Sequence, residues 1–171
     1  KREKLLKLNV EYHRSKGVKI GENVRSFSPL VTAEPYFLEI GNDVSIASNV
    51  KLITHDNSVG IAIPEATDAF GKIKIGNQSF IGEGAIIMPG VHLGDRVIVG
   101  AGSVVTKSFK DGNVVIAGNP ARKICTFDEY IEKVKPYAFS VAGLSYEEKK
   151  NMLLGLHESK LFTSKLDDTV T

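Results

Sequence analysis

Aliphatic residues in the middle of the chain recur at every sixth position. Isoleucine, leucine and valine make up 45 of the 171 residues, so six consecutive matches in one frame arise by chance about once in a few thousand trials. The spacing is therefore a true repeat. It is strongest at Ile75, Ile81, Ile87, Leu93, Val99 and Val105, and is preceded by Ile20, Ile40, Ile46 and Leu52.

A period of six fits neither an amphipathic helix nor an alternating strand. It fits a three-sided coil in which each hexapeptide forms one flat side and a turn of 18 residues stacks on the next at the strand spacing of about 4.8 Å. The repeat thus predicts an all-β fold, a parallel β-helix spanning roughly residues 18–118. The fifth residue of each hexapeptide should also face inward, at Ser79, Ala85, Val91, Val97 and Ser103.

The frame is interrupted twice. Ile20 and Ile40 are 20 residues apart, two more than one turn, and Leu52 and Ile75 are 23 apart, five more than one turn. The second break includes residues 58–72, which contain Gly60, Pro64 and Gly71. Insertions in repeat proteins favour a binding face or a subunit contact, so we expect residues 58–72 to form such a loop.

Helical patterns flank the repeat. Residues 4–13 predict a short helix with Leu5, Leu8 and Tyr12 on one side, and residues 145–148 (SYEE) form a capping box. The second helix should contain Met152, Leu153, Leu154 and Leu156, and residues 127–134 a further one. The expected organisation is an N-terminal helical segment (1–17), the β-helix (18–124, with the 58–72 insertion) and a C-terminal helical extension (125–171), with the helices covering the two ends.

Composition narrows the function classes. No apolar run approaches the roughly 18 residues that a membrane span requires. The net charge of +2 is too small to indicate nucleic-acid binding. Residues 1–25 carry eight Lys or Arg against three Glu, which indicates a solvated surface. The alternative is attraction of a polyanion such as a nucleotide, a glycolipid (for example a lipid-linked glycan) or a membrane surface. The single cysteine, Cys125, excludes an internal disulfide and fits a cytoplasmic location.

Of the four histidines, His55 has the position of a catalyst. It lies in the stretch ITHDN, at the end of a turn and directly before the inserted loop, where an imidazole with a pKa near 6.5 can accept a proton. His92 is expected at an exposed corner, and His13 and His157 on solvated helix surfaces. A histidine-bound metal would require a close pair of histidines on neighbouring turns, which the spacing does not provide, so no metal is expected.

Five short stretches resemble the hexapeptide-repeat acetyltransferases, which include galactoside, maltose, Nod-factor and xenobiotic acetyltransferases. The resemblance extends over about two thirds of the chain and is strongest to the branch that O-acetylates bacterial surface polysaccharides. The most specific stretches are GAGS…TK and AGNPAR. The five are residues 54–56 (THD), 75–82 (IGNQSFIG), 89–91 (PGV), 98–107 (IVGAGSVVTK) and 117–122 (AGNPAR).

The resemblance implies a left-handed β-helix, a homotrimer and acetyl-CoA bound in the groove between two subunits. The family's general base falls on His55, and its aromatic position beside the thioester falls on Phe80. Asp56 and Asn57 are the candidate acceptor-binding residues. The family's remaining coenzyme contacts fall on Ala101, Thr106, Lys107 and Arg122.

The residues themselves agree with acyl transfer. A thiolate leaves readily because its conjugate thiol has a pKa of about 8.5, so the chemistry chiefly needs a base for the acceptor and amide donors for the oxyanion, worth roughly 3 kcal/mol each. The leading hypothesis is O-acetylation of a sugar hydroxyl in polysaccharide biosynthesis. N-acetylation of an aminosugar and a β-helix binding protein without catalysis remain the alternatives.

Overall fold

The structure is a computed structural model that describes residues 2–162. The chain divides into two compact units, Lys1–Asp128 and Glu129–Thr171. The boundary falls four residues after the one predicted at residue 124. The first unit holds the repeat and the candidate site.

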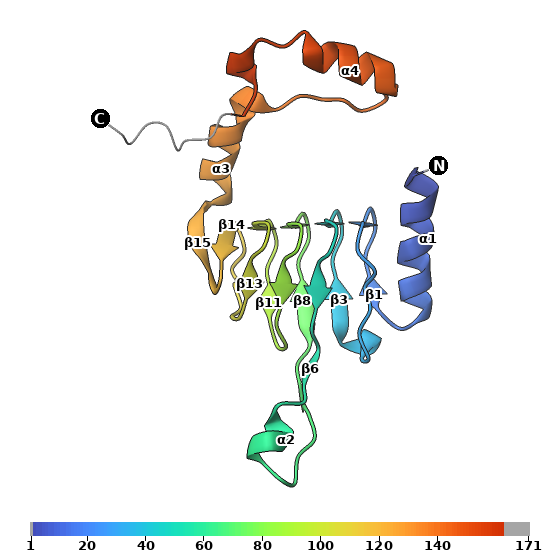
Figure 1. Cartoon of the computed structure of the whole chain (residues 1–171), viewed down its shortest axis with the longest axis vertical. Helices are drawn as coiled ribbons and strands as arrows, with labels where there is room; N and C mark the ends of the chain where they lie inside the picture. Colours follow the sequence, from blue (N-terminus) through green and yellow to red (C-terminus); the bar gives the residue numbers. More distant parts are fainter. Residues whose placement is uncertain (1, 163–171) are drawn as a thin grey trace, which may run out of the picture. The chain divides into compact units, whose positions relative to one another are not determined.

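Short strands of the first unit pair in parallel, turn upon turn, into three sheets (Figure 1). Successive hexapeptides contribute strands to the three sheets in order, since Ile75, Ile81 and Ile87 lie in three different sheets. The first sheet has the order β1 (Lys19–Ile20), β3 (Leu38–Ile40), β8 (Ile73–Ile75) and β11 (His92–Leu93). The second is β13 (Val104–Val105), β10 (Ile86–Ile87) and β5 (Lys51–Leu52). The third is β15 (Ala121–Thr126), β14 (Val114–Gly118), β12 (Val97–Val99), β9 (Phe80–Ile81), β4 (Ser45–Ile46) and β2 (Arg25–Ser26), in which β15 alone pairs antiparallel.

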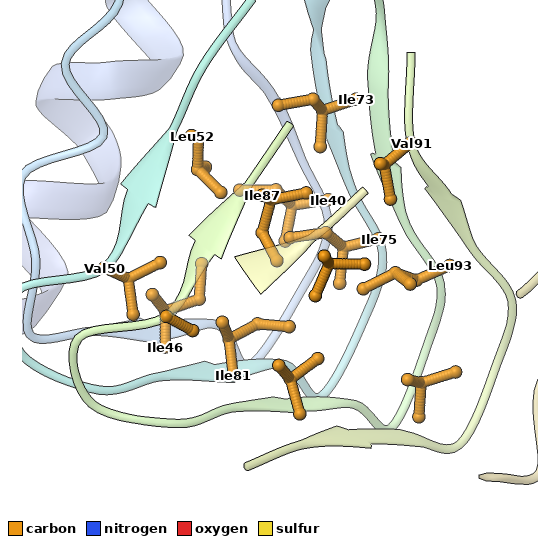
Figure 2. Close-up of a cluster of buried hydrophobic side chains, with 14 of the residues drawn as sticks. Ile40, Ile46, Val50, Leu52, Ile73, Ile75, Ile81, Ile87, Val91 and Leu93 are labelled. Atoms are coloured by element: carbon orange, nitrogen blue, oxygen red, sulfur yellow. The ribbon is translucent and has the colours of Figure 1, made fainter. Parts of the chain in front are cut away.

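The core fills the inside of this coil (Figure 2). Side chains from all three sheets point to a common centre and are nearly inaccessible to solvent, which is the burial that stabilises stacked turns. Both sets of predicted inward positions are buried. The first residues of the hexapeptides are Ile75, Ile81, Ile87, Leu93, Val99 and Val105, and the fifth are Ser79, Ala85, Val91, Val97 and Ser103.

The corner between the first and third sheets repeats one backbone conformation. The residue at this corner has a positive φ of 49–56° in every turn, at Asn23, Asp43, Gln78, Arg96 and Asn113. Beside it, the Asn42 amide donates to Asn77 Oδ1 (2.8 Å) and the Asn77 amide to Asp95 Oδ1 (2.7 Å), so polar side chains link successive turns. Gly76 approaches the next turn so closely that a Cβ there would lie 2.4 Å from the carbonyl carbon of Gly94.

Helix α1 (Arg2–Ser15) covers the open edge of the first turn (Figure 1). Asn9 Nδ2 donates to the carbonyls of Ser26 and Ser28 at 3.1 Å each, and Arg14 Nε donates to the Ile20 carbonyl at 3.1 Å. His13 Nε2 accepts from the Leu30 amide at 3.0 Å. The helix thereby satisfies backbone groups that an uncovered edge leaves unpaired.

One expectation about this helix was wrong. His13 is buried rather than solvated, because its side chain accepts a hydrogen bond from the Leu30 backbone amide in the first turn. Leu5, Leu8 and Tyr12 are exposed, and Val10 is the buried apolar residue of the helix, because docking is directed by polar partners as well as by apolar ones. His92 was also placed wrongly: it lies within β11 and is half-buried, not at an exposed corner.

The insertion is longer than the spacing suggested. Leu52 pairs with Ile87, 35 residues on, where an uninterrupted turn would give 18. Leu52 and Ile75 belong to different sheets, so the 23 residues between these two positions do not measure one turn. The inserted chain forms an antiparallel stem of β6 (His55–Asp56) and β7 (Ala69–Phe70) with the short helix α2 (Val59–Ala62) beyond it, and this hairpin projects from the turns in Figure 1.

The remaining helices are α3 (Phe127–Val134), whose bounds match the predicted segment, and α4 (Tyr146–Leu154). The predicted capping box is present: Ser145 Oγ accepts from the Glu148 amide and Glu148 Oε2 accepts from the Ser145 amide. Helix α4 ends at Leu154, so Leu156 lies outside it. The 3-10 turns are η1 (Pro35–Phe37), η2 (Lys135–Tyr137) and η3 (Glu158–Lys160). Residues 163–171 of the predicted extension lie outside the described residues, and no helix within residues 2–162 has the length and apolarity to cross a membrane.

Candidate active site

His55 begins the stem of the inserted hairpin. Strand β6 follows β5 after two residues, so the coil itself fixes where the histidine emerges. Across the stem, His55 pairs with Phe70, and the Gly71 amide donates to the Thr54 carbonyl at 2.8 Å. These contacts anchor the base of the hairpin and leave the side chain of His55 37% exposed.

The buried carboxylate of Glu34 holds the His55 ring. Glu34 directly precedes η1 and is 9% exposed. Its Oε2 atom lies 2.9 Å from His55 Nδ1 and accepts from the Thr54 hydroxyl at 2.6 Å. The Thr32 and Thr54 hydroxyls are hydrogen-bonded to each other in turn. A carboxylate only accepts, so Nδ1 carries the proton and Nε2 is left as the proton-accepting nitrogen.

Electrostatics favour a basic imidazole at this position. The hydrogen bond from Thr54, followed by that from His55, lowers the pKa of Glu34, so this carboxyl is ionised. The hydrogen bond to Glu34 in turn raises the pKa of His55 above its ordinary value, with smaller contributions from the charges of Asp68 and Asp56. The arrangement can orient one imidazole and stabilise its protonated form, which is what a general base requires.

Asp56 and Asn57 lie at the start of the hairpin loop. Asp56 Oδ1 accepts from the Ser58 amide at 2.9 Å, and hydrogen bonding by Ser58 lowers the pKa of Asp56. This contact shapes the loop, as an Asx turn does. Asn57 is exposed, and its carbonyl accepts from the Gly60 amide. Acceptor binding by either residue remains a prediction.

The predicted coenzyme residues fall on two parts of the coil. Thr106 and Lys107 directly follow β13, which stacks on β10 and then on β5, the strand that leads to His55. The ends of β13 and β5 are therefore two strand spacings or roughly 10 Å apart on the same side of the coil. Phe80, by contrast, is on the outside of the third sheet, 44% exposed. Ala101 follows β12 in that same sheet and Arg122 lies in β15. Within one chain the structure thus groups Thr106 and Lys107 with His55, but not Phe80.

Sequence reasoning missed Glu34, Thr32 and the role of Thr54. Glu34 and Thr32 lie between Ile20 and Ile40, whose spacing is two residues longer than one turn, and Thr54 is hydrogen-bonded to both. That excess, with an acidic residue in it, was the available signal. Among residues 2–162, no group of three or more His, Cys, Asp or Glu is arranged to hold a metal ion.

Comparisons with known proteins agree with this architecture. The profile of the bacterial transferase hexapeptide (six repeats) matches residues 72–107. Protein CapG of Staphylococcus aureus is 46% identical over 159 residues, which cover 88% of this chain and 91% of that protein.

Two solved structures are also similar. The maltose O-acetyltransferase of Clostridium difficile 630 is 34% identical with a TM-score of 0.56, covering 64% of this chain and 59% of that one. A galactoside acetyltransferase in complex with coenzyme A is 31% identical with a TM-score of 0.56, covering 75% of this chain and 63% of that one. This chain therefore spans about three fifths of each solved enzyme. The chain belongs to the hexapeptide-repeat acetyltransferase family.

Proposed function

We propose that this protein is an acetyl-CoA-dependent O-acetyltransferase that acylates a sugar hydroxyl in bacterial polysaccharide biosynthesis, such as that of a capsule, lipopolysaccharide or exopolysaccharide. The observation that carries the proposal is the 2.9 Å hydrogen bond between Glu34 and His55 at the base of the inserted hairpin. In an acetyltransferase family, an oriented and electrostatically supported imidazole indicates activation of a weakly acidic nucleophile. A neutral amine needs such a base less than a hydroxyl does, so the pair favours O-acetylation over N-acetylation.

The transfer follows from the protonation states at this pair. His55 Nε2 removes the proton of the acceptor hydroxyl as the oxygen attacks the thioester carbonyl, and the ionised Glu34 stabilises the imidazolium that forms. The tetrahedral intermediate collapses with cleavage of its C–S bond. The proton on Nε2 then passes to the departing thiolate, which gives free coenzyme A and an acetyl ester and regenerates the neutral imidazole.

We infer that the coil is left-handed and that the protein is a homotrimer with a groove between each pair of chains. The convex sides of one coil provide no deep cleft, whereas two coils side by side form a long groove suited to an extended cofactor. The distribution of the candidate residues supports this, because Phe80 lies on a different sheet from the edge that carries His55, Thr106 and Lys107. A second chain would supply the other wall, with its Phe80 and Ala101 beside the thioester. Lys107 on the wall of His55 and Arg122 on the facing wall would lie toward the phosphates.

The test is release of free coenzyme A thiol from acetyl-CoA against a panel of sugars, with the wild type and His55→Ala side by side. We expect thiol release that depends on both a sugar and His55. Alkaline hydroxylamine should then remove the product's acetyl group, since it cleaves oxygen esters and leaves amides intact. A hydroxylamine-resistant product would instead establish N-acetylation, and no sugar-dependent release would contradict the proposal.

A further inference from the structure

Three aromatic side chains lie next to the Glu34–His55 pair and have no part in the mechanism above. Tyr36 and Phe37 belong to η1, and Phe70 to β7. Their rings form a continuous series, with Tyr36 5.0 Å from Phe37 and Phe37 6.3 Å from Phe70, centroid to centroid, both edge to face. Phe70 lies 6.2 Å from the His55 ring. We call Tyr36, Phe37 and Phe70 the aromatic wall.

The two segments that build the base also build the wall. Tyr36 and Phe37 follow Glu34 by two and three residues, so the chain that supplies the carboxylate supplies these rings. Phe70 is directly opposite His55 in the antiparallel stem, and residues so paired project to the same side. The wall is therefore fixed relative to Nε2, as an acceptor site must be.

Two rings of the wall are open to solvent, and the third, Phe37, is half-buried. Tyr36 is 63% and Phe70 57% exposed, although large aromatic side chains gain most from burial. Lys72 Nζ lies 5.9 Å from the centre of the Phe37 ring and contributes a charge at one end. A cluster of exposed rings rimmed by polar groups marks a surface that something else contacts.

We propose that the aromatic wall binds a pyranose ring of the acceptor and sets the protein's preference for a cyclic sugar over an open-chain polyol. The π-face of an aromatic ring is negative, and the C–H groups on one side of a pyranose carry partial positive charge, so the sugar stacks on the exposed face of one ring, Phe70 or Tyr36, while Phe37 stands edge to face with both. Stacking holds the sugar flat and turns the hydroxyls at its rim toward His55. The inference rests on the proposed function and assigns residues to its acceptor.

The experiment detects binding without turnover. Saturation-transfer NMR is recorded on the intact protein with a panel of methyl hexopyranosides, and with mannitol and glycerol as open-chain probes. The His55→Ala variant is measured in parallel. We expect at least one pyranoside to bind through the C–H protons of one face, the open-chain probes to give no transfer, and His55→Ala to retain pyranoside binding.

The variants Phe70→Leu and Tyr36→Leu keep apolar bulk and remove the π-face. We expect each to raise the dissociation constant of the pyranoside by roughly 5-fold or more. Tyr12→Leu is the matched control, since Tyr12 is a similarly exposed aromatic residue (57%) on α1. The affinity of this control variant for the pyranoside should equal that of the wild type.

Three results would overturn the assignment: no pyranoside binding by the wild type, binding unchanged in both wall variants, or a change of oligomeric state in those variants, which would make the wall a subunit contact. Failure of the proposed function has another signature, because loss of His55-dependent thiol release with intact pyranoside binding would contradict the mechanism and leave the wall in place.

Discussion

At the scale of single residues, the decisive arrangement is a carboxylate that holds one nitrogen of an imidazole so that the other faces outward. Glu34 is nearly buried and keeps its charge because two donors, the Thr54 hydroxyl and His55 Nδ1, satisfy the same oxygen. The hydrogen bond to Glu34, and to a lesser degree the charge of this carboxylate, raises the pKa of His55.

Replacing this carboxylate should change the pH dependence of catalysis. In the wild type, kcat/KM should rise with pH through the raised pKa of His55, because only the neutral imidazole accepts a proton. In Glu34→Gln that pKa should return toward the ordinary value of about 6.5, so the acid limb moves to lower pH while the plateau falls about 10-fold or more. Steady-state rates between pH 5 and 9 measure both changes. An acid limb at the same pH in both proteins would remove Glu34 from the mechanism.

The residues also show why part of the site was unpredictable. A six-residue frame fixes which side of the chain faces inward, so Ser79 and Ser103 were placed in the core despite their hydroxyls, and both are buried. Glu34 and His55 are 21 residues apart, and their contact depends on the irregular first turn, where the frame is lost. The two-residue excess between Ile20 and Ile40 marks the irregular turn, but spacing alone does not show which side chains that turn brings together.

At the scale of elements, the first turn depends on helix α1 for its hydrogen bonds. The helix was predicted from its pattern, but its buried side was not, because Leu5 and Leu8 offered a plausible apolar face while the docked face contains Asn9 and His13. Which side of the helix docks depends on the backbone groups of residues 20–30 that need hydrogen-bond partners. These groups lie outside the helix, so the helix sequence alone does not reveal the docked side.

Protonation of His13 should weaken the fold. Burial lowers the pKa of His13 below the unfolded value of about 6.5, and its Nε2 must be neutral to accept from Leu30. Its contribution is therefore fully present above about pH 6.5 and lost as pH falls below it. His55, whose folded pKa is raised, has the opposite dependence, so the variant must be compared with the wild type.

We expect His13→Ala to lower the free energy of unfolding at pH 7.5 by about 1–3 kcal/mol, the cost of leaving a buried amide unpaired. The difference from the wild type should shrink toward pH 5. Denaturant titrations at both values measure it, with Lys4→Ala, exposed on the same helix, as the control that should match the wild type. A difference independent of pH would show that His13 acts through packing alone.

At the scale of the whole molecule, the proposed groove requires more than one chain. The exposed residues Ile61 and Ile63 on the inserted hairpin, at 92% and 51%, are apolar surface that a neighbouring copy can cover. Closed three-fold symmetry would give three equivalent grooves. Light scattering at micromolar concentration should therefore report a trimer, and a stable, fully active monomer would contradict the shared groove.

The coenzyme prediction belongs to this scale as well. Lys107 and Arg122 are exposed, so each alanine variant should raise the KM for acetyl-CoA in dilute buffer, and the increase should diminish in high salt as the phosphate attraction is screened. Lys51→Ala, on the exposed side of β5, is a comparison for the loss of one surface charge. Equal KM values for both variants and the wild type at low salt would remove these residues from the site.

The central proposal is that His55 is the base that activates a sugar hydroxyl. Its most direct test is the turnover of His55→Ala, measured together with the affinity of this variant for acetyl-CoA. We expect kcat to fall by on the order of 10²-fold or more while the dissociation constant for acetyl-CoA is unchanged, because the imidazole acts on the acceptor and not on the coenzyme. A variant that keeps near-normal turnover on a hydroxyl acceptor would show that His55 is not the base.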